Sequence, residues 1–183
     1  MSAGPFAIRH PLDGAVSASP ARNANHVAIL PDPMVISIAA LPGEEAAAAE
    51  TLAGFPPESL RFVGPGEWLL VEPAQDSALL ASVRAALGRR ALVTEQGSGR
   101  AVLHLSGPDS RAILAKLVPL DLDREVFAIG QSANCFFAHV SANLARIGED
   151  EFEISLMRSF ALFAFEELME MGLEFGLTAG FAT

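Results

Sequence analysis

The sequence predicts an α+β fold, a two-layer sandwich in which helices pack on a mainly antiparallel sheet. Segments with strand periodicity alternate with short amphipathic helical segments. Several successive strands are joined by short turns, which favours antiparallel pairing. The chain has 183 residues, of which 51% are hydrophobic, so one domain with a sizeable core is expected.

Residues 1–33 differ from the rest of the chain in composition. They are rich in Ala, Pro, Ser and Asn, and their prolines interrupt any helix. Apolar side chains such as Val27 and Ile29 are available to anchor the segment against its own domain or a neighbour. We therefore expect an extended N-terminal arm over 1–33, followed by a single α+β domain over 34–183.

The first half of the predicted domain alternates strands and helices. Gly64-Pro65-Gly66 is a turn signal between two strands, and Asp76 is a suitable N-cap for a helix that ends before Gly88. The expected elements are a strand over Met34–Ala40, a helix over Glu44–Ala53, strands over Leu60–Val63 and Trp68–Glu72, and a helix from Asp76 to Leu87.

The second half continues the same alternation. Pro108 is placed to start a helix that Pro119 ends, and Ser159 is a candidate cap for the last helix. Residues 120–134 form a long connection. The expected elements are strands over Ala91–Glu95 and Arg100–Leu105, a hairpin of Cys135–Val140 and Asn143–Ile147 around Ser141-Ala142, a half-buried strand over Phe152–Met157, and a helix to about Met171.

The charge of the chain is acidic and uneven. The net charge is −10; residues 1–120 hold nine Arg and Lys against eleven Asp and Glu, whereas residues 121–183 hold three Arg against eleven Asp and Glu. Such a chain is repelled by phosphates, so no nucleic-acid partner is expected. No apolar run is long enough to span a bilayer, so no membrane partner is expected. The single Cys135 excludes an internal disulfide and fits a reducing compartment, which predicts a cytoplasmic location.

Glycine and metal-ligand patterns give no site. Gln96–Arg100 is Gly-rich but lacks the Gly-Lys-Ser/Thr end of a phosphate-binding loop, so a turn between strands is the favoured interpretation. Cys135 and His139 are spaced to share one strand face, but no third ligand is evident, and burial of Cys135 as a small hydrophobe is favoured over a nucleophile. The sequence therefore predicts no metal site.

Charged candidates also have simpler explanations. Asp121 and Asp123 are close enough in sequence for acid–base work, but solvated loop charges are favoured. Arg158, between a strand and a helix, suits either a structural ion pair, which is favoured, or the grip of a carboxylate or phosphate. An acidic stripe on the last helix indicates either a solvated face or a surface for a basic partner; it comprises Glu166, Glu167, Glu170 and Glu174. No catalytic residue is predicted.

Several short motifs in a fixed order resemble a known family. They are Gly66-Glu67-Trp68-Leu69-Leu70, Gly99-Arg100-Ala101-Val102-Leu103, Leu105-Ser106-Gly107-Pro108-Asp109, Leu120-Asp121-Leu122, Phe152 and Arg158-Ser159. Between Glu67 and Gly176 the chain resembles the gamma subunit of heterotetrameric sarcosine oxidase. More distantly, it is similar to the folate-binding domain of aminomethyltransferases, the glycine cleavage T-proteins.

The resemblance implies a non-catalytic subunit of an oxidoreductase complex that demethylates sarcosine. Its partners would be larger flavoprotein subunits, which carry FAD, covalent FMN, NAD and tetrahydrofolate, while this chain binds no cofactor of its own. The alternatives are a free-standing folate-binding aminomethyltransferase-like protein, a subunit of a similar N-methylglutamate dehydrogenase, or an α+β scaffold without ligand.

The chain departs from the folate-transferase pattern at its signature. The Thr-Gly-Tyr-Thr-Gly-Glu segment of active transferases is here Leu144-Ala145-Arg146-Ile147-Gly148-Glu149, and the chain contains no Tyr that could stack on a pterin. Glu153 falls on an acidic position of the family motif, and the resemblance makes it the one expected cofactor-binding residue, at a folate-like position. A strand-surface glutamate is the alternative interpretation.

Overall fold

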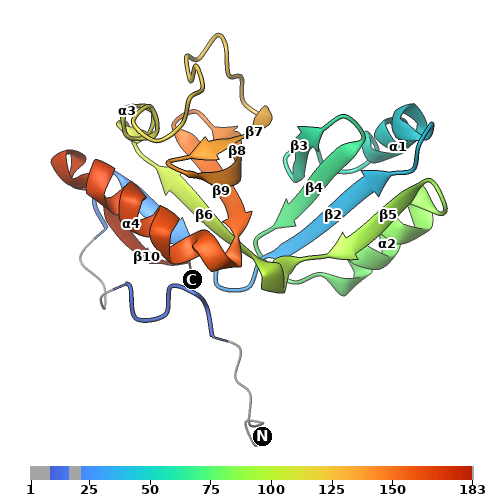
Figure 1. Ribbon diagram of the computed structural model, residues 1–183, viewed down its shortest axis with the longest axis horizontal. Coiled ribbons are helices and arrows are strands. Elements are labelled where there is room, and N and C mark those ends of the chain that lie inside the picture. The colour runs from blue at the N-terminus through green and yellow to red at the C-terminus, as the bar shows by residue number, and fades with distance from the viewer. Residues whose placement is uncertain (1–8, 17–21, 183) are drawn as a thin grey trace, which may run out of the picture.

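Two β-sheets, each covered by helices on its outer side, meet along one edge in a V (Figure 1). The computed structural model describes residues 9–16 and 22–182. The predicted α+β class with mainly antiparallel pairing is confirmed, and the strands are divided between two sheets.

The elements alternate along the chain in the predicted manner. The strands are β1 (His26–Ile29), β2 (Met34–Ala40), β3 (Leu60–Gly64), β4 (Glu67–Glu72), β5 (Ala91–Glu95), β6 (Arg100–Ser106), β7 (Ser132–Phe137), β8 (Val140–Gly148), β9 (Glu151–Met157) and β10 (Thr178–Phe181). The helices are α1 (Glu45–Leu52), α2 (Ser77–Leu87), α3 (Ser110–Leu114) and α4 (Ala161–Met171), with short 3₁₀ turns at Gly97–Gly99, Arg158–Phe160 and Leu173–Phe175.

The larger sheet has the order β10-β1-β6-β9-β8-β7, and only the β1–β10 pair is parallel. Alternate residues of β6 and β9 point into a core that α3 and α4 cover, as strand periodicity requires. Leu103, Leu105, Phe152 and Ile154 are fully buried in this core. Leu12, in the described part of the N-terminal segment, is also buried there.

The smaller sheet has the order β3-β4-β2-β5 and is antiparallel throughout. Its outer face packs on α1 and α2 through a second core that includes Ile36, Leu70 and Val83. The Asp76 carboxylate accepts the amides of Ala78 and Leu79, so the predicted cap of α2 is confirmed.

The inner faces of the two sheets contact each other. Val35, Leu69 and Val71 of the smaller sheet form one apolar cluster with Val102 of β6 and Leu30. The chain crosses from the larger sheet to the smaller after β1 and returns after β5, so both crossings lie at the base of the V (Figure 1). The order of the layers is therefore helix, sheet, sheet, helix.

Strand β1 corrects the expectation of an extended arm at residues 26–29. It lies between β6 and β10, with Val27 and Ile29 fully buried. Four residues are too few to show strand periodicity, and the prolines before them predict an irregular segment. Their partners in β6 and β10 are distant in sequence, so only the folded sheet reveals the strand. The expectation of an extended arm also covers residues 1–8 and 17–21, which lie outside the described residues.

Two local boundaries also differ from the predicted ones. The hairpin turn is at Ala138-His139, not Ser141-Ala142, because burial of Phe137 sets the register and the Ala138 amide donates to the Leu117 carbonyl. Ala138 takes a left-handed backbone conformation there, with φ of 51°. Helix α4 begins after a 3₁₀ turn, and Ser159 does not cap it.

The Gly107-Pro108-Asp109 segment fastens the chain before β1 to the start of α3. Asn25 is buried; its amide nitrogen donates to the Asp109 carboxylate over 2.8 Å, and its amide oxygen accepts the Asp109 amide over 3.0 Å. Gly107 has a φ of +131°, and a Cβ there would lie 2.4 Å from the Ala24 carbonyl oxygen. Only glycine permits this close approach.

Gly107→Ala is expected to lower the free energy of unfolding by more than the roughly 1–3 kcal/mol of backbone strain, because the new methyl group displaces Asn25. Urea unfolding followed by circular dichroism measures it. Gly130→Ala is the matched control, because Gly130 also has a positive φ, of 87°, but open space around it. Equal losses in the two variants would contradict the packing argument.

Candidate functional site

The candidate site is a buried ion pair that joins the two sheets. Arg61 of β3 points from the smaller sheet toward Glu153 of β9 in the larger one, and its Nε and Nη2 donate to the two carboxylate oxygens over 2.9 and 3.2 Å. The two side chains are only 5% and 4% exposed. The forked guanidinium matches the carboxylate geometry, which makes the contact directional as well as charged.

His104 completes the cluster from the neighbouring strand. It is directly opposite Glu153 in the β6–β9 register, and its Nε2 lies 3.1 Å from the second carboxylate oxygen. The His104 side chain is 26% exposed and is the part of the cluster nearest to solvent. Strand periodicity places both residues on the inner face, since their neighbours Leu103 and Ile154 point into the helix-covered core.

The charge of Glu153 is stabilised by its partners. Burial raises the pKa of the carboxyl, but the hydrogen bond from His104 and the charge and hydrogen bonds of Arg61 lower it further, so the net direction is downward. Glu153 is therefore ionised at neutral pH. Arg61 also donates through Nη1 to the carbonyls of Glu58 and Leu60, so four of its five N–H groups have partners.

Side-chain hydrogen bonds extend this junction along the edge of β3. The Ser132 hydroxyl accepts the Phe62 amide over 2.6 Å and lies 3.3 Å from the Phe62 carbonyl oxygen. The Asn143 amide donates to the same carbonyl over 2.9 Å. Two side chains of the larger sheet thus satisfy the backbone amide and carbonyl of Phe62 in the edge strand β3. A further strand would otherwise pair at this position.

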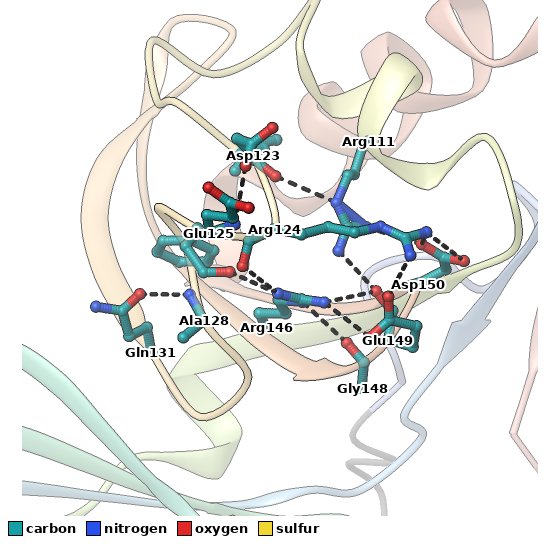
Figure 2. A network of polar contacts seen from close by, with 12 residues as sticks. Arg111, Asp123, Arg124, Glu125, Ala128, Gln131, Arg146, Gly148, Glu149 and Asp150 are labelled. Atoms are coloured by element: carbon teal, nitrogen blue, oxygen red, sulfur yellow. Dashed lines mark hydrogen bonds and ion pairs between the residues drawn. The ribbon is translucent and has the colours of Figure 1, made fainter.

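A second buried network, shown in Figure 2, is built around Arg146. Arg146 lies in the segment 144–149, which the resemblance aligns with the transferase signature. Arg146 is 3% exposed and donates to the carbonyls of Arg124, Phe127, Gly148 and Glu149 and to the Glu149 carboxylate. These acceptors lie in the long connection before β7 and in the turn between β8 and β9. Arg146 therefore holds that connection against the sheet.

Arg111 supports the same turn from α3 (Figure 2). Its guanidinium donates to the Asp150 carboxylate over 2.8 Å and to the Glu149 carbonyl over 2.7 Å, and it lies 5.2 Å from the centre of the Phe152 ring. Arg124 reaches Asp150 over 3.1 Å. The arginines of this network have carbonyl or carboxylate partners within the chain, so the network is suited to positioning the loop.

The other sequence candidates do not come together. Cys135 is on β7 and packs against the larger core, where burial raises the pKa of its thiol to about 11, while His139 is in the turn. The predicted shared strand face is therefore wrong. The Asp121 and Asp123 carboxylates each accept a nearby backbone amide of an exposed loop. In the described ranges, no three His, Cys, Asp or Glu side chains are grouped so that they could hold a metal ion.

Glu153 is recognisable in the sequence, but neither of its partners is. A glutamate between Phe152 and Ile154 in a buried strand requires a counter-charge, and that was the available signal. The twelve Arg and Lys residues offered no means of selecting Arg61, which is 92 residues away. The assignment of Glu153 as a folate-like binding position stays a prediction.

The fold is similar to part of an aminomethyltransferase. The structure matches the glycine cleavage system aminomethyltransferase T from Bartonella henselae with a TM-score of 0.63 and 18% sequence identity, over 86% of this chain and 48% of that one. At that identity the likeness concerns the fold alone.

A family model narrows the assignment. The sarcosine oxidase gamma subunit family model matches residues 31–173, and the chain belongs to that family. The structure also matches a chain of the heterotetrameric sarcosine oxidase from Corynebacterium sp. U-96, in complex with pyrrole 2-carboxylate, with a TM-score of 0.75 and 25% identity, over 91% of this chain and 95% of that one.

Two relatives are named sarcosine oxidase subunit gamma. The one from Corynebacterium sp. strain U-96 is 29% identical over 134 residues, which is 73% of this chain and 65% of the relative. The one from Arthrobacter sp. is 33% identical over 113 residues, or 61% of this chain and 52% of the relative. The matched part of the chain thus spans about half to two thirds of each relative's length.

Glu153→Gln is expected to lower the free energy of unfolding at pH 7 by about 3–5 kcal/mol, because it leaves the Arg61 charge buried and unpaired. The double variant Arg61→Met/Glu153→Met should lose less than Glu153→Gln or Arg61→Met alone. Urea unfolding measures all three, and Glu151→Gln, an exposed position on the same strand, is the control. A similar cost for Glu151→Gln and Glu153→Gln would count against the ion pair.

The same pair has a defined pH dependence. Because the folded-state pKa of Glu153 is lowered, its contribution is present above the unfolded-state pKa of about 4.3 and is lost as pH falls through the folded-state value. The difference in stability between the wild type and Glu153→Gln should therefore narrow below about pH 4. A difference that stays constant down to pH 2 would contradict this.

Proposed function

We propose that this chain is the non-catalytic gamma-type subunit of a flavin-dependent sarcosine oxidase complex, which oxidatively demethylates sarcosine. Its role is structural: it buries surface on the larger flavoprotein subunits and stabilises their assembly. The observation that carries the proposal is the match over 95% of a chain from a heterotetrameric sarcosine oxidase, together with membership of the gamma subunit family.

The candidate site supports a structural role. Both oxygens of Glu153 are engaged by Arg61 and His104, and the arginines of the second network bind backbone carbonyls and neighbouring carboxylates. These charges hold elements of the chain together. On this proposal FAD, covalent FMN, NAD and tetrahydrofolate belong to the larger subunits, and the complex is cytoplasmic. None of the helices in the described residues is long and apolar enough to cross a membrane.

One end of the larger sheet supplies a surface suited to a partner. The C-terminal ends of β7 and β9 both lie there, since both strands are antiparallel to β8. Phe136 and Met157 near those ends are 63% and 48% exposed, and Phe160 and Leu162 at the start of α4 are 46% exposed each. Exposed apolar side chains grouped in this way are typical of a protein interface.

Helix α4 adds acidic charge beside that surface. Glu166 and Glu170 are exposed, whereas Glu174 forms an ion pair with Lys116. Charged rims steer association more than they determine affinity. We propose that the exposed pair faces a more basic region of a larger subunit.

A free-standing folate-binding aminomethyltransferase-like protein is the second candidate, and the shared aminomethyltransferase fold favours it. A folate would have to take the Glu153 carboxylate from its present partners, of which His104 is the more exposed. A subunit of a similar N-methylglutamate dehydrogenase would use the same assembly surface with a different substrate.

The assembly role is tested by reversing charge on α4. Glu166→Lys/Glu170→Lys should slow association with the co-expressed larger subunits, on the order of tenfold at low salt, and less at high salt. Stopped-flow mixing or co-purification at two salt concentrations measures it. The matched control is Glu45→Lys/Glu50→Lys on α1, also exposed but on the smaller sheet.

Equal slowing by the control pair would place the interface elsewhere, and failure of the unaltered chain to join the complex would overturn the proposed function. A truncation that tests the N-terminal arm should stop at residue 8, because Leu12 is buried in the larger core and removal of residues 1–33 also removes the interior strand β1.

Tetrahydrofolate is expected to bind the isolated chain weakly or not at all, because Glu153 is engaged and no Tyr is available to stack on a pterin. Calorimetric titration of the full chain measures this. A micromolar or tighter site, about −8 kcal/mol or better, would favour the aminomethyltransferase-like candidate instead.

A further inference from the structure

A pocket of about 380 Å³ lies where the chain crosses between the two sheets. One wall is the first crossing, Pro31–Pro33, and another is the return turn from Gly97 to Arg100. Arg158, in the turn before α4, and the N-terminal pair Arg9-His10 complete the lining. Four segments that are distant in sequence therefore meet around one small volume.

The pocket is basic in a strongly acidic chain. Arg9, Arg100 and Arg158 line it, although the chain has only 12 Arg and Lys against 22 Asp and Glu. Within the described ranges, none of these three forms an ion pair with a carboxylate. The one acidic residue in the lining, Asp32, accepts a hydrogen bond from Gln75 over 3.2 Å. The described lining thus holds three arginines against one carboxylate, so its net charge is positive.

Hydrogen-bond donors remain available as well. Arg100 uses its Nε for the Gln96 side chain over 3.1 Å, and Arg158 donates one Nη2 contact to the Arg9 carbonyl. In His10 the Nδ1 accepts the Leu12 amide over 3.2 Å, so in the neutral ring the proton is on Nε2. That Nε2 is buried and has no partner among the described residues.

The walls of the pocket are fixed by close packing. A Cβ at Gly97 would lie 2.4 Å from the Pro33 carbonyl oxygen, so the return turn rests directly on the first crossing. The Gln75 side chain donates to that same carbonyl over 3.0 Å. A pocket held in this way requires little reorganisation to bind a ligand, which favours affinity.

We propose that this pocket is a binding site for a small-molecule oxyanion, a phosphate or a carboxylate group, held by Arg100 and Arg158 with Arg9 at the rim. Guanidinium groups bind both kinds of oxyanion through paired hydrogen bonds. The volume lies in the range of small-molecule sites and exceeds that of a bare phosphate, so the anionic group belongs to a small organic molecule.

The site would also couple ligand binding to the stability of the junction between the sheets. An anion in the pocket contacts both crossings at once, together with the turn that precedes α4. A ligand that binds only the folded chain raises its melting temperature with concentration. This inference does not rest on the proposed function, because it is argued from the lining of the pocket alone and is tested on the isolated chain.

The test titrates the full chain with inorganic phosphate, and separately with citrate, against sodium chloride at matched ionic strength. Calorimetry and thermal unfolding should both show saturable binding, with a dissociation constant in the millimolar range or tighter. The two titrations distinguish a phosphate site from a carboxylate site. Arg100→Gln and Arg158→Gln should each weaken binding about tenfold or more, as loss of a charge-assisted contact predicts.

Arg89→Gln is the matched control, since Arg89 is exposed beyond α2 and does not line the pocket. Arg158→Lys keeps the charge but loses the forked guanidinium, so it should retain part of the binding. Thermal unfolding without an anion shows whether Arg158→Gln is simply less stable. No saturable effect of either anion, or equal weakening by Arg89→Gln, would overturn the proposal and leave only general ionic screening.

Discussion

The Arg61–Glu153 ion pair is the constraint on which the arrangement of the two sheets depends. A carboxylate buried in β9 is costly unless a positive charge meets it, and the guanidinium that reaches it comes from β3 of the other sheet. The pair therefore helps to fix the distance and register between the two layers, which also share a small apolar cluster. His104 and the Ser132 and Asn143 contacts act at the same junction.

Motifs that resemble a ligand-binding family are used here to hold the chain together. Glycine and aspartate of the Gly107-Pro108-Asp109 segment fasten Asn25, and Arg146 in the former signature position binds loop carbonyls. Asn25 and Arg146 are buried and have partners within the chain, which is how buried polar groups are normally accommodated. The chain shares its fold with an aminomethyltransferase and belongs to the sarcosine oxidase gamma subunit family.

Exposed apolar side chains, an acidic helix face and a basic pocket lie at different places on the molecule. The exposed apolar side chains near Phe136 and Phe160 and the acidic face of α4 lie on the larger sheet and its helix. The basic pocket is at the base of the V, between the sheets. The net charge of −10 opposes the approach of an anion, so any anion bound at the pocket must be held by the local arginines.

The sequence by itself determined the α+β class, most of the helices and strands, the Asp76 cap and the family resemblance, because these depend on local periodicity, turn residues and motif order. The tertiary structure decided which residues act together. Strand β1, the Ala138-His139 turn and the partner of Glu153 all depend on contacts between distant segments; Arg61 and Glu153 are 92 residues apart. A local pattern shows that a charge is buried, but only the folded chain shows which other charge can reach it.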